Sequence, residues 1–210
     1  MAEVIPSINA PTFEEVRERI QKIESYVSWC HLDVTDGIFS KHATWHNPSD
    51  LPLLDTKCNV EVHLMIEEPE RIIDTWLIEP IKRVIVHLEA SKDIDMIISR
   101  CRRAGIEIGL AIRPDTFWDV LVPWLQKVDL IQVLAVNPGP SGQQMTNEIV
   151  DKVRHLRTAC KECILEVDGG INPDTAKRVR AAGASILVSA GYIFSHPDKA
   201  EAIRELNGSE

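Results

Sequence analysis

The sequence predicts a single α/β domain folded as a (β/α)8 barrel. Short β-like runs alternate with amphipathic segments along the whole chain, and no linker, low-complexity tract or change in composition interrupts them. With 210 residues, 44% of them hydrophobic, the chain can bury one sizeable core. We therefore expect residues 1–210 to form one domain.

Eight apolar runs are the expected strands. In chain order they are Glu3–Ile8, Ser28–Val34, Asn59–Met65, Arg83–Leu88, Glu107–Ile112, Leu130–Val136, Ile164–Val167 and Ser185–Val188. Eight strands alternating with helices in a chain of this length fit a compact closed barrel. An open doubly wound sheet is the alternative, but no G-x-G-x-x-G follows the first strand, so its dinucleotide-binding form loses its main support.

Helices are expected between the strands. The segments are Thr12–Glu24, Pro69–Trp76, Pro173–Ala182 and Lys199–Leu206, with Pro48–Leu54 short and weakly helical. Thr12 and Glu15 have the spacing of a capping box, and two of the segments carry proline in the first turn. Gly105 and Gly183 stand where a helix should end before the next strand.

Charge and hydropathy exclude two classes of partner. The net charge is −9, and Lys and Arg are not concentrated anywhere, which argues against a nucleic-acid surface. No stretch approaches the roughly 20 apolar residues of a membrane span, and no basic segment precedes Val4 and Ile5 as in a signal peptide. A cytoplasmic protein without membrane or nucleic-acid partners is expected.

The five cysteines are an odd number spread over a long chain, unlike the disulfide framework of a small secreted domain. Reduced thiols are therefore expected. Cys160 and Cys163 form one C-x-x-C, but a structural zinc site needs two further ligands, and no second pair follows. We predict no metal there.

The residues that carry chemistry stand at strand ends. His31 and Asp33 are two apart in a strand and share its inward face, His63 ends the third strand, and Asp168 follows the seventh. A lone inward histidine is more often a core residue and a lone strand-end aspartate a helix cap. Together, two imidazoles and two carboxylates at the mouth of a barrel predict a site for one divalent cation, Zn²⁺, Fe²⁺, Mn²⁺ or Co²⁺.

Further polar residues face inward near this set. Glu61 and Glu166 share strand faces with His63 and Asp168, one layer deeper, and could orient the ligands. His87 and Glu89 also alternate inward on the fourth strand, and the sequence assigns them no role.

Five motifs occur in order over nearly the whole chain. They are Pro6-Ser7-Ile8, His31-x-Asp33-Val34-x-Asp36-Gly37, Val62-His63-Leu64-Met65, Asn137-Pro138-Gly139-x-x-Gly142-Gln143 and Glu166-Val167-Asp168-Gly169-Gly170-Ile171. In these motifs the chain resembles the ribulose-phosphate 3-epimerase family. The resemblance implies that His31, Asp33, His63 and Asp168 bind the metal, that Asp33 and Asp168 also exchange the proton, and that Ser7 contacts the substrate. It also implies a homo-oligomer.

The implied reaction inverts carbon 3 of a phosphorylated ketose, converting D-ribulose 5-phosphate to D-xylulose 5-phosphate. Epimerisation beside a ketone removes a proton from one face of the carbon and returns one to the other, so two acid/base groups are needed. Strands two and seven are expected on opposing sides of the barrel, which would place Asp33 and Asp168 suitably. A cation would stabilise the enediolate between the two steps, and no redox cofactor is required.

The phosphate is expected on backbone amides, because no Lys or Arg occurs in the loops after strands six, seven and eight. The predicted substrate-binding residues are Ser7, His63, Gly139, Pro140, Ser141, Gly142, Asp168, Gly169, Gly170, Ala190 and Gly191. Amides of Gly142, Gly170, Ala190 and Gly191 are the predicted phosphate donors. The alternative is that these glycines only make tight turns.

Departures from the family pattern lie around the expected cavity. Thr35 and Leu134 stand where the family usually has Met, Pro140-Ser141 replace Phe-Gly, and Ala190-Gly191 replace Gly-Ser. Another ketose phosphate, allulose 6-phosphate or a tetrulose phosphate, therefore stays open as substrate.

Two other functions are alternatives to the epimerase. A decarboxylase or aldolase of the related phosphate-binding barrels needs an added Lys or Glu near the reacting carbon, and no inward Lys stands out. A non-catalytic sugar-phosphate-binding barrel is expected to have lost at least one of His31, Asp33, His63 and Asp168, and all four remain.

Overall fold

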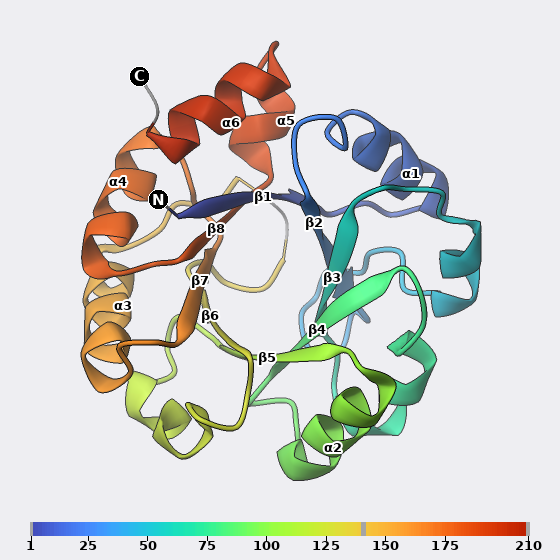
Figure 1. Ribbon diagram of the computed structural model, residues 1–210, viewed down its shortest axis with the longest axis horizontal. Helices are drawn as coiled ribbons and strands as arrows, with labels where there is room; N and C mark the ends of the chain where they lie inside the picture. The colour runs from blue at the N-terminus through green and yellow to red at the C-terminus, as the bar shows by residue number, and fades with distance from the viewer. Residues whose placement is uncertain (1, 140–141, 209–210) are drawn as a thin grey trace.

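Eight parallel strands close into one barrel in a computed structural model that describes residues 2–139 and 142–208 (Figure 1). The strands are β1 (Glu3–Ile8), β2 (Trp29–Thr35), β3 (Asn59–Met65), β4 (Ile81–His87), β5 (Glu107–Ile112), β6 (Leu130–Leu134), β7 (Ile164–Asp168) and β8 (Ile186–Ser189). Each strand pairs with the next along the chain, and β8 pairs with β1. The predicted (β/α)8 fold is confirmed.

Helices surround the barrel as an outer ring (Figure 1). The α-helices are α1 (Phe13–Gln21), α2 (Ile94–Ala104), α3 (Asn147–Ala159), α4 (Pro173–Ala182), α5 (Gly191–Ser195) and α6 (Lys199–Asn207). The connections after β2, β3 and β5 carry 3-10 helices instead, namely η1 (Pro48–Leu53), η2 (Pro69–Arg71), η3 (Ile73–Trp76) and η4 (Trp118–Trp124). Over the described residues, no helix is both long and apolar enough to cross a membrane.

Helix ends follow the predicted capping residues. The Thr12 hydroxyl accepts a hydrogen bond from the Glu15 amide at 3.3 Å, and Gly105 and Gly183 end their helices in the left-handed conformation. One helix prediction was wrong. Residues 69–76 form two 3-10 turns, because Ile72 leaves the helical conformation (φ −124°, ψ −1°) and no side chain caps the N-terminus of either turn.

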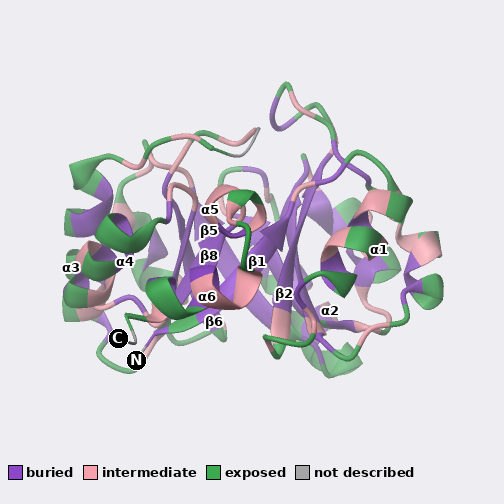
Figure 2. Ribbon diagram, turned by 90° about the horizontal axis from the view of Figure 1, so that it is seen from above, coloured by how far each residue is buried: buried purple, intermediate pink, exposed green. Residues whose placement is uncertain are grey.

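The core of the described residues consists of three apolar clusters, and the sheet separates the two larger ones. Outward side chains of the strands, such as Leu64 and Leu187, pack against the helices, so the strands are buried while the outer faces of the helices stay exposed (Figure 2). A smaller apolar cluster is made of Ile5, Ile85, Ala111, Leu130, Ile186 and Val188, with Trp29 packed against it. Beside this cluster the barrel interior is polar, and that is where the candidate site lies.

One cysteine prediction was also wrong. Cys160 and Cys163 form a disulfide, with their Cα atoms 5.5 Å apart, whereas Cys30, Cys58 and Cys101 are free. The reason is local geometry, since Cys160 is the C-terminal cap of α3 and has extended backbone angles, so the chain turns back and brings Cys163 beside it.

We predict that the buried side chains on the outer face of the sheet contribute much more to the free energy of unfolding than exposed apolar side chains do. Leu64 is fully buried on β3, so Leu64→Ala should lower the free energy of unfolding by about 2–5 kcal/mol. Leu53 is 67% exposed, and Leu53→Ala should change that free energy by no more than about 0.5 kcal/mol. Urea unfolding measures both variants, and equal losses would contradict this account of the core.

Candidate active site

Four side chains meet at the carboxyl ends of three strands. His31 and Asp33 come from β2, His63 from β3 and Asp168 from β7, and one nitrogen or oxygen of each lies within 4.8 Å of the others. Asp33 Oδ1 is 3.4 Å from His31 Nε2 and 3.3 Å from His63 Nδ1. Asp168 Oδ2 is 3.9 Å and 3.5 Å from the same two nitrogens. The structure thus brings the four predicted ligands together.

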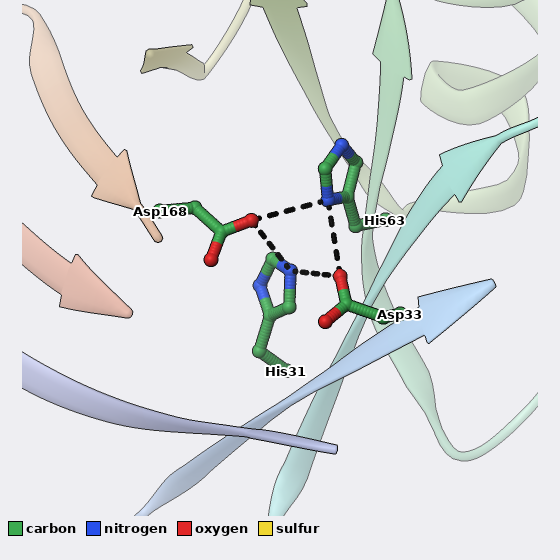
Figure 3. A group of neighbouring side chains, drawn as sticks. All are labelled: His31, Asp33, His63 and Asp168. Atoms are coloured by element: carbon green, nitrogen blue, oxygen red, sulfur yellow. Dashed lines mark hydrogen bonds and ion pairs between the residues drawn. The ribbon is translucent and has the colours of Figure 1, made fainter. Parts of the chain in front are cut away.

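The two carboxylates approach from opposite sides. Figure 3 shows Asp33 and Asp168 facing each other with the imidazoles of His31 and His63 between them. Their strands are not diametrically opposed, because only β8 and β1 separate β7 from β2 on one side of the barrel. The side chains reach across the mouth, so the expected two-sided arrangement arises from their direction rather than from strand position alone.

His31 is oriented from below by Glu61. His31 Nδ1 lies 2.8 Å from Glu61 Oε1, and the other oxygen of Glu61 accepts a hydrogen bond from Arg83 at 2.6 Å. Burial would raise the pKa of Glu61, but His31 and Arg83 lower it, so Glu61 is an ionised acceptor and His31 Nδ1 donates. His31 Nε2 then faces the cluster, and it makes no hydrogen bond within the described part of the chain.

The centre of the cluster attracts positive charge. Burial would lower the pKa of His31, yet the carboxylates of Asp33 and Glu61 raise it well above its usual value. Burial would raise the pKa of Asp33, yet the imidazoles of His31 and His63 hold it far below its usual range. Ser7 donates a hydrogen bond to Asp33 Oδ2 at 2.6 Å, which leaves Oδ1 turned to the centre. The site is therefore built for imidazole protons or for a cation that replaces them.

Sequence reasoning missed two neighbours of His63. His63 Nε2 lies 2.9 Å from His87 Nε2, and the Gln132 amide nitrogen lies 3.4 Å from His63 Nδ1 and 3.3 Å from Asp168 Oδ2. The inward alternation of β4 was the signal for His87. For Gln132 the signal was one amide in the apolar run Leu130–Leu134.

Glu166 does not orient a ligand, although its strand position suggested that it could. It is fully buried, its two oxygens have no hydrogen-bond partner among the residues described, and burial raises its pKa well above the usual value. The raised pKa favours the neutral form of Glu166. His31 Nδ1 lies 3.9 Å from Glu166 but 2.8 Å from Glu61, so only Glu61 is hydrogen-bonded to the imidazole of a candidate metal ligand.

A cavity of about 380 Å³ opens above the four side chains. Of the residues predicted to bind substrate, its walls include Ser7, Gly139, Gly142, Asp168, Gly169, Gly170, Ala190 and Gly191, together with the carboxylate residue Asp33. Pro140 and Ser141 lie outside the described residues. His31 and His63 are fully buried beneath the cavity and do not line it.

Glycines let the loops after β6, β7 and β8 approach one another. Gly170 has φ +65°, and a Cβ there would lie 2.6 Å from the Met145 amide nitrogen. A Cβ on Gly169 would lie 2.6 Å from a methyl carbon of Val136. These glycines are therefore required by close packing as well as by turn geometry. No Lys or Arg is among the described residues that line the cavity.

Fold and site together define a class of protein: a (β/α)8-barrel enzyme in which two facing carboxylates and two imidazoles lie beneath a cavity walled by glycine loops. Residues 3–194 match the Ribulose-phosphate 3 epimerase family. A ribulose-phosphate 3-epimerase of Bacillus subtilis (strain 168) is 31% identical over 224 positions that cover all of both chains. One from Synechocystis sp. is 35% identical, covering 99% of this chain and 94% of that protein.

The chain therefore belongs to the ribulose-phosphate 3-epimerase family and is an isomerase, a carbohydrate epimerase. Among solved structures, a 3-hexulose-6-phosphate synthase superposes with a TM-score of 0.72 over 98% of each chain, at 15% identity. That similarity shows the shared barrel fold alone.

We predict that Gly170 is far less replaceable than a glycine of similar conformation outside the site. Gly105 has φ +70° with no atom within 4 Å of its missing Cβ, so Gly105→Ala should cost only the left-handed strain, about 1–2 kcal/mol. Gly170→Ala adds a collision with Met145 and should cost about 1–3 kcal/mol more. Urea unfolding of both variants tests this, and equal losses would show that the loops do not interlock.

Proposed function

We propose that the chain is a metal-dependent epimerase that converts D-ribulose 5-phosphate to D-xylulose 5-phosphate by inverting carbon 3. The observation that carries the proposal is the pair of facing carboxylates, Asp33 and Asp168, set around two imidazoles at the floor of a cavity. Relatives that carry the name ribulose-phosphate 3-epimerase align over the whole chain and support the choice of substrate.

The donor set fits one divalent cation. His31 Nε2 points at the centre without a hydrogen bond among described residues, and Asp33 and Asp168 supply the two oxygens of an N2O2 set suited to Zn²⁺, Fe²⁺, Mn²⁺ or Co²⁺. When bound, such a cation acts as a Lewis acid that stabilises negative charge on the substrate oxygens.

The protein's own residues move the proton. Asp33 and Asp168 are each less than a tenth exposed and both line the cavity, so either carboxylate can reach a carbon held between them from its own side. One removes the carbon 3 proton to give an enediolate, and the other delivers a proton to the opposite face. Ser7 holds Asp33 through its second oxygen, which fixes the direction of the first.

The phosphate is assigned to the glycine wall of the cavity. The loops containing Gly142, Gly170, Ala190 and Gly191 offer backbone N–H groups and no cationic side chain, which suits an anion bound by an acidic protein. Leu134 lines the same cavity where the family usually has Met, so a longer or shorter ketose phosphate is the second candidate. Parallel assays with allulose 6-phosphate and a tetrulose phosphate decide between them.

We predict that the purified protein holds about one divalent cation per chain. Removal by a chelator should abolish epimerisation and readdition should restore it, and His63→Ala should lower occupancy sharply because a ligand is lost. His155→Ala is the control, since His155 is exposed on α3 and stacks on Trp118. Elemental analysis gives the metal content. Full activity of a metal-free protein would refute the metal-dependent mechanism.

We predict that both aspartates are needed for inversion. In D2O the wild-type enzyme should place solvent deuterium at carbon 3 of the product, and Asp33→Asn or Asp168→Asn should reduce turnover by at least about 100-fold, because an amide neither takes nor gives the proton. The two variants need not be equal in exchange, since an enzyme that keeps the first base can wash deuterium from labelled substrate without completing inversion.

The matched control is Asp174→Asn, an exposed aspartate in the first turn of α4. Metal content is measured for each variant, so that loss of proton transfer is separated from loss of the cation. Near-normal turnover of Asp168→Asn with metal bound would exclude the two-base mechanism.

A further inference from the structure

A chain of hydrogen bonds runs from His63 away from the cavity. The second nitrogen of its ring, Nε2, points away from the other three side chains (Figure 3) and lies 2.9 Å from His87 Nε2. His87 Nδ1 lies 3.2 Å from Glu89 Oε2. Glu89 Oε1 in turn accepts hydrogen bonds from the Arg113 amide at 2.8 Å and from the Thr116 hydroxyl. Both histidines are fully buried.

The direction of these hydrogen bonds is set at the Glu89 end. Glu89 accepts two hydrogen bonds through its other oxygen, and an ionised carboxylate can only accept, so His87 Nδ1 must carry the proton that joins them. Burial would raise the pKa of Glu89, but its hydrogen bonds to His87, Arg113 and Thr116 lower it to about 2. In a neutral imidazole the remaining nitrogen, His87 Nε2, is then an acceptor.

His63 must therefore donate from Nε2 when it is neutral, as a metal ligand has to be. Its lone pair then lies on Nδ1, which faces Asp33 Oδ1 at 3.3 Å and Asp168 Oδ2 at 3.5 Å. Gln132 independently supports this tautomer of His63, because its amide nitrogen, which only donates, lies 3.4 Å from Nδ1. Turning the amide over would set its oxygen against Asp168 Oδ2.

Packing prevents His87 from turning away. Its ring stacks on that of His63, with the centroids 5.0 Å apart, and the ring centroid of Phe39 lies 4.7 Å from that of His87. Phe39 is itself held, because the Arg113 guanidinium lies 4.0 Å from its ring centroid and donates to its carbonyl at 3.1 Å. The orientation of His63 is thus fixed through two shells of contacts.

We propose that His87 and Glu89 are positioning residues that hold His63 in the tautomer and orientation in which Nδ1 faces the cation. The inference rests on the proposed function in so far as a cation binds there. Each imidazole of the cluster then has its own anchor, since Glu61 holds His31 directly and Glu89 holds His63 through His87. Neither His87 nor Glu89 touches the cavity, so neither is a catalytic residue.

Zinc affinity, measured by competition with a coloured chelator, tests the role of the pair. His87→Leu fills the space but offers His63 no acceptor, and it should weaken zinc binding about 10–100-fold. His87→Gln can accept from His63 and donate to Glu89, so it should bind zinc within a few-fold of wild type. Glu89→Leu, at the partly exposed end of this chain of hydrogen bonds, should also weaken zinc binding. It replaces His87→Leu as the test if that variant does not fold.

A second readout does not depend on the metal. Nitrogen-15 NMR of the metal-free protein, recorded at alkaline pH where the ring is neutral, should show His63 protonated at Nε2 in wild type and His87→Gln. In His87→Leu the fraction of His63 rings that carry the proton on Nδ1 should rise. His155→Leu, on the outer surface of α3, is the control for removing a histidine.

Wild-type zinc affinity together with an unchanged His63 tautomer in His87→Leu would overturn the inference. A wild-type protein that binds no zinc would instead contradict the proposed function. The tautomer measurement would still decide whether His87 directs His63.

Discussion

The interior of this barrel holds more buried charge than an apolar core tolerates, and the arrangement of its strands depends on pairing that charge. An unpaired buried carboxylate or guanidinium is costly, so each inward polar group needs a partner on a neighbouring strand. Register supplies the partners. Glu61 lies opposite both His31 on β2 and Arg83 on β4, and Arg83 also reaches Glu107 at 2.6 Å. The polar interior is therefore a connected network, which begins at Arg83 and ends at the candidate site.

This network explains why the four metal-candidate residues point where they do. Glu61, fixed by Arg83, turns His31 so that Nε2 faces the mouth, and Ser7 turns one oxygen of Asp33 the same way. Glu166 makes no hydrogen bond among the described residues, and burial together with the charge of Glu61 raises its pKa, which favours its neutral form. Burial therefore has two effects in this interior. A buried carboxylate with hydrogen-bond partners, such as Glu61, holds a candidate ligand rigidly, whereas burial of Glu166, which has no such partner among the described residues, favours its neutral form.

Strand periodicity was enough to predict the barrel and the four converging side chains, because residues two apart on a strand share a face and parallel strands end together. It could not predict contacts that depend on the register between neighbouring strands and on side-chain direction. His87 was visible as an inward residue, but its contact with His63 depends on the register of β4 against β3, in which His63 lies opposite Ile85. The Cys160–Cys163 disulfide depends on one extended residue at the end of α3, and the break at Ile72 depends on one backbone conformation.

The rim of the cavity is divided into two halves that differ in how they can change during evolution. On the side of β6 and β7 the wall is closely packed, since a Cβ on Gly169 would lie 2.6 Å from a methyl carbon of Val136 and a Cβ on Gly170 would lie 2.6 Å from the Met145 amide nitrogen. A new residue there displaces two loops at once. On the side of β1 to β3 the lining residues are Ser7, Asn9, Asp33 and Met65, and none of them is a glycine. New substrate preferences can therefore arise by single replacements in the second half, while the first half is inherited as a unit.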